Sequence, residues 1–221
     1  AGHNSYFYPS ISASAVLSDI WRLPQKITYW SVRGGYAEVG SDTEPYRLEN
    51  TYSYSSKYGS QSGVTMPSTL SNTDLKPERM HSYEIGTDFR MFDNRLGLDL
   101  TYYNTLNTNQ IVQIPISATS GYDTRYINAG EIRNYGFEAT LSYTPVKTQT
   151  GFQWDGTINF SMNKSRVEEI SDEYDQYVYS WAAIYSDEDA RVYAIAKEGE
   201  PMGNLYGTGL RHTDDGKLIV D

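Results

Sequence analysis

Residues 152–163 read FQWDGTINFSMN, and this stretch decides the fold class. Apolar or small side chains occupy every second position from Phe152 to Met162, and polar side chains occupy the positions between them. Successive side chains of a β-strand point to opposite faces, so this period of two predicts a strand with one apolar and one polar face. Its length matches the roughly 9–11 residues with which a tilted strand crosses a bilayer.

The same alternation recurs in residues 137–143, 96–102 and 83–91, and more weakly in 10–17 and 27–39. The connections between these six segments alternate in length. Residues 19–26, 92–95 and 145–151 form short turns, whereas residues 39–81, 105–134 and 165–221 are long and polar. Outer-membrane barrels have short periplasmic turns and long extracellular loops. The sequence therefore predicts an all-β chain, an antiparallel transmembrane barrel wall with long extracellular loops.

We expect residues 1–164 to hold the transmembrane strands and their connections, and residues 165–221 to form an extracellular loop region. Residues 110–116 are candidates for a strand extension above the membrane. Aromatic side chains near strand ends would mark the lipid–water boundaries. They are Tyr6, Tyr8, Trp21, Tyr29, Trp30, Tyr102, Tyr103 and Trp154.

Composition excludes several other classes. No run of about 18 apolar residues exists, as a transmembrane helix would need. A barrel strand is apolar on one face only, so the mean hydropathy of -0.59 is compatible with a membrane wall. The chain has no Cys, which excludes disulfide frameworks and thiol catalysis. A net charge of -10 argues against nucleic acid as a partner.

Six strands are too few to close a barrel of this type, of which the smallest usual case has eight. The chain also opens without the basic and apolar segments of a signal peptide. We therefore expect it to be a piece of a longer exported protein.

Seven motifs occur in a fixed order along the chain. They are YPSISAS at 8–14, GGYAEVG at 34–40, DLKPER at 74–79 running into YEIG at 83–86, NRLGLDLTYYN at 94–104, NAGEIRNYGFE at 128–138, NFSMNK at 159–164 and GEPMGNLYG at 199–207. Together they resemble the SusC/RagA family of TonB-dependent outer-membrane transporters, over most of the chain.

The resemblance implies a mid-to-late segment of a large barrel, of the 22-stranded kind, that encloses an N-terminal plug. It implies import of oligosaccharides or peptides across the outer membrane of a Gram-negative cell. The partners it implies are a SusD-like surface lipoprotein that acts as a lid and a TonB complex that supplies energy. The plug, the TonB-contacting segment and the closing strands have no counterpart in this sequence.

Aromatic side chains in the long loops are the candidate substrate-binding residues. Flat rings with a polar rim stack on sugars or grip peptides, and they equally pack loops together or contact a partner. The substrate-binding candidates are Tyr122, Tyr126, Tyr177, Tyr179 and Trp181, and Tyr174 and Tyr185 lie in the same segments. On the strands, Glu84, Asp88, Arg90, Asp99 and Glu138 should face the lumen and hydrogen-bond within the wall or to the plug.

Acidic residues and histidines are two further groups that could form sites. The acidic residues Glu168, Glu169, Asp172, Glu173, Asp175, Asp187, Glu188 and Asp189 lack EF-hand spacing, so a solvated loop is favoured over a calcium site or paired catalytic carboxylates. The histidines His3, His81 and His212 are far apart and lack a catalytic-triad context, so we predict no metal, no cofactor and no enzymatic activity.

Two alternatives stay open. A soluble surface adhesion module with Tyr-rich loops would pair the apolar faces of two sheets in one core. A passive porin would share the wall but would need no plug.

Overall fold

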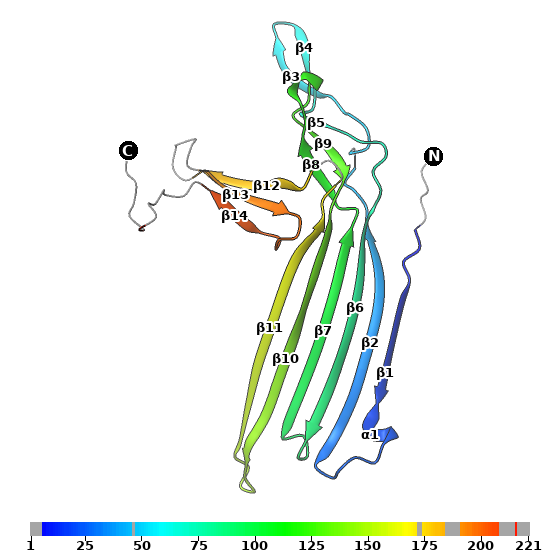
Figure 1. Cartoon of the computed structure of the whole chain (residues 1–221), viewed down its shortest axis with the longest axis vertical. Coiled ribbons are helices and arrows are strands. Elements are labelled where there is room, and N and C mark those ends of the chain that lie inside the picture. Colours follow the sequence, from blue (N-terminus) through cyan, green and yellow to red (C-terminus); the bar gives the residue numbers. More distant parts are fainter. Residues whose placement is uncertain (1–5, 46, 172–173, 184–190, 208–214, 216–221) are drawn as a thin grey trace.

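The computed structural model describes residues 6–45, 47–171, 174–183, 191–207 and 215. Six long antiparallel strands form one tall sheet, shown in Figure 1. In spatial order they are β1 (Ser10–Val16), β2 (Ile27–Ser41), β6 (Glu78–Met91), β7 (Leu96–Thr108), β10 (Glu131–Lys147) and β11 (Gln153–Glu169). The six-stranded sheet is open, with β1 and β11 at its edges, as expected of part of a barrel wall. The predicted fold class is confirmed.

Strand register sorts the side chains onto two faces. One row across all six strands contains Ala13, Gly34, Ile85, Tyr102, Phe137 and Met162. The adjacent row contains Ser14, Arg33, Gly86, Thr101, Glu138 and Ser161. We call the face of the first row the outer face and that of the second the inner face. The predicted alternation therefore holds across the whole sheet, apolar on one side and polar on the other.

The outer face has no covering layer within the described residues. Ile85 is 62% exposed, Ile158 55% and Phe160 53%. The buried apolar residues of the described chain are few and none lies on the outer face: Ile114, Ala129, Ile132, Val167, Ile170 and Ala196. Two apolar faces therefore do not meet in a common core, contrary to what a soluble sandwich requires. Among the described residues, no helix has the length and apolar character to span a bilayer.

The lower end of the sheet in Figure 1 carries the short connections. Between β1 and β2 lies a single helical turn, α1 (Leu17–Ile20), which the sequence did not predict. Between β6 and β7, Phe92, Asp93 and Asn94 all have positive φ values of 55–64°, and the Arg95 amide donates to the Phe92 carbonyl at 3.1 Å. Asn and Asp tolerate this left-handed conformation, so the short turn predicted at 92–95 is present.

Aromatic rings cluster near this lower end. Trp30 lies 6.2 Å from Trp21 and 6.0 Å from Phe89, between ring centroids. Tyr143 and Trp154 lie 6.2 Å apart. The prediction that Tyr102 and Tyr103 lie near a strand end is wrong.

Both tyrosines lie in the middle of β7, because this strand continues to Thr108. Tyr102 faces outward opposite Ile85 and Phe137. Tyr103 faces inward, where its hydroxyl donates to Asn163.

The upper end carries three smaller sheets. They are the hairpin β3 (Ser53–Tyr58) and β4 (Gln61–Thr65), the sheet β5 (Thr69–Leu70), β9 (Thr124–Asn128) and β8 (Ile111–Pro115), and the sheet β12 (Gln176–Ala183), β13 (Arg191–Lys197) and β14 (Asn204–Gly207). A short 3-10 helix, η1 (Ala118–Ser120), joins β8 to β9. The predicted strand within 110–116 exists, although it belongs to its own sheet. β11 also continues past residue 164, to Glu169.

Candidate binding groove at the extracellular end

A groove of about 660 Å³ lies between the β5–β9–β8 sheet and the β12–β13–β14 sheet. Ile114, which is fully buried, lies at its base. The lining residues are Val112, Gln113, Ile114, Pro115, Thr124, Tyr174, Gln176, Tyr177, Val178, Tyr179 and Ile195. A volume of this size lies in the range of ligand-binding pockets, about 300–1,000 Å³.

The groove meets two strands along their edges. Residues 112–115 of β8 and 176–179 of β12 line it consecutively. Side chains of a strand alternate between faces, so four consecutive lining residues mean that the strand presents its edge. Within the described residues, β8 and β12 are edge strands of their sheets, each paired on one side only. Backbone N–H and C=O groups of two strands therefore border the groove.

The lining contains aliphatic and tyrosine side chains, two glutamines and one threonine, and no charged side chain. The Tyr177 and Tyr179 rings meet edge to face with centroids 6.2 Å apart. Burial, and to a lesser degree Tyr179, raises the pKa of the Tyr177 hydroxyl above its usual value. This hydroxyl therefore stays protonated at neutral pH and can donate a hydrogen bond. The groove suits an uncharged, partly apolar ligand.

The five predicted substrate-binding residues do not all lie at the groove. Tyr177 and Tyr179 line the groove. Trp181 belongs to β12, but its side chain lies outside the described part of the chain, as does Tyr185. Tyr122 accepts a hydrogen bond from the Asn50 amide at 3.1 Å, so it packs within the loops.

Tyr126 also packs within the loops. Arg47 lies over its ring at 4.9 Å, and its hydroxyl accepts from Gln113 at 2.8 Å. Tyr126 thus holds the side chain of Gln113, which lines the groove. Sequence reasoning missed the lining residues of β8 and β13, because no local pattern shows which segments meet above the membrane.

The described acidic residue Glu168 and the described histidine His81 both contact neighbouring side chains. Glu168 accepts from Arg133 at 2.8 Å and lies 3.8 Å from Arg166. His81 stacks on Tyr36, whose hydroxyl lies 3.1 Å from His81 Nδ1. No group of three or more potential metal ligands occurs in the described ranges. The residues that lie outside those ranges are His3, Asp172, Glu173, Asp187, Glu188, Asp189 and His212.

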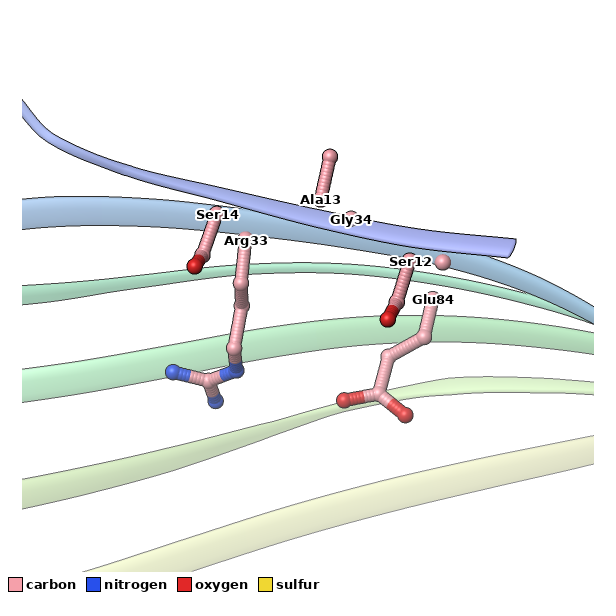
Figure 2. A pocket seen from close by; sticks show the side chains of 7 residues that line it. Ser12, Ala13, Ser14, Arg33, Gly34 and Glu84 are labelled. Carbon is pink, nitrogen blue, oxygen red and sulfur yellow. The ribbon is translucent and has the colours of Figure 1, made fainter.

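Charged side chains line the inner face, as predicted. Arg33 forms a two-pronged ion pair with Asp99, at 3.0 and 3.1 Å, and Arg90 pairs with Asp88 at 2.7 Å. Figure 2 shows Arg33 and Glu84 projecting to the same side of the sheet as Ser12 and Ser14. These four residues line a shallow hollow of about 360 Å³.

The other two predicted lumen residues behave differently from Asp88, Asp99 and Arg90. Among the described residues, the side chains of Glu84 and Glu138 form no hydrogen bond, although their backbones pair within the sheet. Their carboxylates are therefore available to groups that enter the lumen.

A turn at residues 198–203 anchors the β12–β13–β14 sheet to the top of β11. The Val167 amide donates to the Glu200 carbonyl at 2.9 Å, and the Gly199 amide donates to the Val167 carbonyl at 2.8 Å. The Met202 amide donates to Ser165 Oγ at 3.1 Å. Val167, Ile170 and Ala196 form a buried cluster beneath this turn. One wall of the groove is thus held by the membrane strand itself.

The Glu200 carboxylate organises this turn. It accepts hydrogen bonds from the Tyr206 hydroxyl and from Asn204 Nδ2, and it pairs with Lys197 at 3.1 Å. These contacts, with Tyr206 the largest cause and Lys197 next, lower the pKa of Glu200 from an ordinary 4.5 to about 2. The carboxylate is therefore charged at neutral pH and throughout the mildly acidic range.

The Glu200 contacts predict a pH dependence. Because the folded pKa is lowered, their contribution is complete above about pH 4.5 and is lost as pH falls towards 2. Amide hydrogen exchange over residues 197–206 should be faster in Glu200→Gln than in the wild-type full-length protein at pH 6. The difference should shrink below pH 4.5 and disappear only as the pH falls to about 2. Equal exchange at pH 6 would show that the carboxylate does not hold the turn.

The sequence profile of the family described as "TonB dependent receptor-like, beta-barrel" matches residues 2–216. TonB-dependent receptor P3 of Formosa agariphila is 29% identical over 214 residues, which is 93% of this chain and 21% of that protein. TonB-dependent receptor P39 of the same organism is 29% identical over 185 residues, which is 82% of this chain and 16% of that protein. The chain therefore spans about a fifth of the length of the curated relatives it matches.

Solved structures give the same fold. A chain in the structure of the RagAB peptide transporter superposes with a TM-score of 0.70 at 16% identity, covering 96% of this chain and 24% of that one. A chain of the RagAB peptide importer in its open-open state superposes with a TM-score of 0.70 at 14% identity, covering 98% and 24%. At this level of identity the likeness concerns the fold.

Proposed function

The chain belongs to the family of TonB-dependent receptor-like β-barrels, and from this premise we propose that it forms part of the wall and extracellular rim of an outer-membrane nutrient importer. Residues 1–164 supply the transmembrane strands, and residues 165–221 supply the extracellular region above β11. The mechanism is binding followed by gated passage through the barrel, without covalent chemistry. The observation that carries the proposal is the single-layered sheet with an exposed apolar outer face and a charged inner face.

The partners follow from the same premise. A TonB complex supplies energy through parts of the receptor outside this chain. A SusD-like lipoprotein covers the extracellular end, where three small sheets rise above the wall (Figure 1). Glu84 and Glu138 on the inner face offer charged groups to a plug inside the barrel. Their carboxylates point into the space that a plug fills.

We propose that the groove between β8 and β12 receives the cargo, and that a peptide suits it better than an oligosaccharide. An extended peptide can add to a strand edge through backbone hydrogen bonds, with its side chains in flanking pockets. The edge strands β8 and β12 both line the groove, and the lining is aliphatic and aromatic with two glutamines and one threonine, without carboxylates.

Substitution of Tyr179 tests the cargo site. Tyr179 is 43% exposed and lines the groove, so Tyr179→Ala removes contact area without emptying a core. We expect the half-saturating concentration for uptake of a fluorescent peptide mixture by cells that carry the full-length receptor to rise about tenfold, equivalent to about 1.4 kcal/mol. Tyr54→Ala is the matched control, because Tyr54 is 88% exposed on β3 and lies outside the groove.

Uptake in cells that lack TonB separates importer from porin. Loss of uptake supports an energised importer. Uptake that continues unchanged without TonB would favour the passive porin and overturn the proposal. Equal uptake by Tyr179→Ala and wild-type cells would leave the importer in place and reject the groove as cargo site.

A further inference from the structure

Two arginines lie directly opposite each other on the outer face of the wall. Arg133 of β10 and Arg166 of β11 are partners in the antiparallel register. Like charges directly opposite on neighbouring strands destabilise a sheet. A position that breaks a local rule of this kind points to a role other than strand pairing.

The positive charge around this pair is only partly compensated. Within the described residues, Glu168 pairs with both arginines, at 2.8 Å from Arg133 and 3.8 Å from Arg166. Arg133 also donates to the Asn104 side chain at 3.1 Å. Lys164 lies two residues before Arg166 and therefore on the same face. Three cations thus lie on neighbouring outer-face positions of β10 and β11, in a chain with a net charge of -10.

The cluster lies at the upper boundary of the apolar outer face. Along β10 the outer-face residues run Ala139, Phe137, Tyr135 and then Arg133. Phe137 packs on Phe160 with ring centroids 5.2 Å apart. Aromatic side chains such as Tyr135 mark the edge of the hydrocarbon region. Arg133 and Arg166 follow immediately above, at the level of lipid headgroups.

The side chains of both arginines are partly exposed on the outer face. The side chain of Arg166 is 56% exposed and that of Arg133 35% exposed. Planar guanidinium groups bind phosphate oxygens through paired hydrogen bonds. An anionic phosphate would add a second negative charge beside Glu168, which pairs closely with Arg133 and only loosely with Arg166. The acyl chains below that phosphate would lie against Phe137, Phe160 and Met162.

We propose that Arg133, Arg166 and Lys164 form a binding site for the phosphate group of an acylated lipid of the outer leaflet. The site rests on the orientation of the wall in the membrane and does not depend on the transported cargo. Glu168 competes with the lipid phosphate for the two arginines. The lipid fixes the β10–β11 hairpin at the point where it leaves the membrane.

The test measures binding of bisphosphorylated lipid A to the purified full-length receptor by native mass spectrometry. We expect the double variant R133Q/R166Q to bind this lipid at least about tenfold more weakly than wild type. We expect Glu168→Gln to bind it more tightly, because the competing carboxylate is removed. Lys76→Gln, at an exposed extracellular lysine, should bind like wild type.

Three outcomes would overturn the proposal. The first is that R133Q/R166Q and wild type bind lipid A equally well. The second is that wild type binds lipid A without its phosphates as tightly as the bisphosphorylated form. The third is that inorganic phosphate alone displaces the lipid as well as free lipid A does, which would indicate a simple anion site. A purely structural role for the cluster predicts that Glu168→Gln weakens folding without tightening lipid binding. Heat-modifiable migration of each variant confirms that its barrel is folded.

Discussion

Replacement of Gly136 by alanine is expected to prevent the wall from assembling. A Cβ at Gly136 would lie 2.0 Å from the Met162 carbonyl oxygen and 2.7 Å from the Tyr103 hydroxyl, whereas ordinary contact begins near 3.4 Å. The nearer obstacle is backbone of the neighbouring strand, which cannot rotate away. Relief requires β10 and β11 to separate where they pair. We expect a cost of about 3 kcal/mol, and a loss of most of the heat-modifiable receptor in the outer membrane.

Gly35→Ala is the matched control. Gly35 also lies on the inner face, yet a Cβ there would meet its nearest atoms, the Ile11 carbonyl oxygen and Ser12 Cβ, at 3.6 and 3.7 Å. This variant should assemble at the wild-type level. Normal assembly of Gly136→Ala would contradict the close approach of β10 and β11. Equal loss in both variants would point to a general need for glycine in the wall.

A positive charge on the outer face should have the second large effect. Ala139 lies between Leu100 and Phe160 in the middle of the apolar band. An arginine on the lipid side near the bilayer midplane costs about 2–4 kcal/mol. Ala139→Arg in the full-length receptor should therefore lower the fraction that folds into liposomes, measured by heat-modifiable migration.

The adjacent residue supplies the control on the opposite face. Thr140 follows Ala139 and faces inward, where its register partner on β7 is Asp99. Thr140→Arg would lose the hydrogen bond to Asn159 but would place its charge in the polar lumen beside a carboxylate. We expect it to fold nearly as well as wild type. If Thr140→Arg folds less well than Ala139→Arg, the assignment of the two faces is wrong.

The sequence predicted the membrane part of the fold well. All six wall strands follow the period-two pattern, because hydrocarbon on one side and a polar lumen on the other impose opposite demands on neighbouring residues. The resemblance to the SusC/RagA family is likewise confirmed by the match to the TonB-dependent receptor-like barrels. The prediction was weaker above the membrane.

The upper strand segments were missed because the pattern disappears there. β6 begins at Glu78 and β10 at Glu131, each several residues before the predicted start. Outside the bilayer both faces of a strand are wet, so alternation is no longer required. β12, β13 and β14 within 165–221 were missed for the same reason.

The candidate site could be predicted only in part. Tyrosine-rich loops pointed to Tyr177 and Tyr179, which do line the groove. Tyr122 and Tyr126 also lie in a tyrosine-containing loop, yet their hydroxyls accept hydrogen bonds from Asn50 and Gln113. Which tyrosines meet depends on how the extracellular sheets pack against one another, and that information is spread over segments far apart in the chain.

A wall that is one layer thick has a consequence for how such chains diverge. Side chains on the outer face meet fluid hydrocarbon rather than a fitted protein partner, so one apolar residue can replace another without a compensating change elsewhere. As sequences diverge, the identity of individual residues should be lost, while the alternation of apolar and polar positions along each strand should be kept. The superposition at a TM-score of 0.70 with 16% identity is what such drift would leave behind.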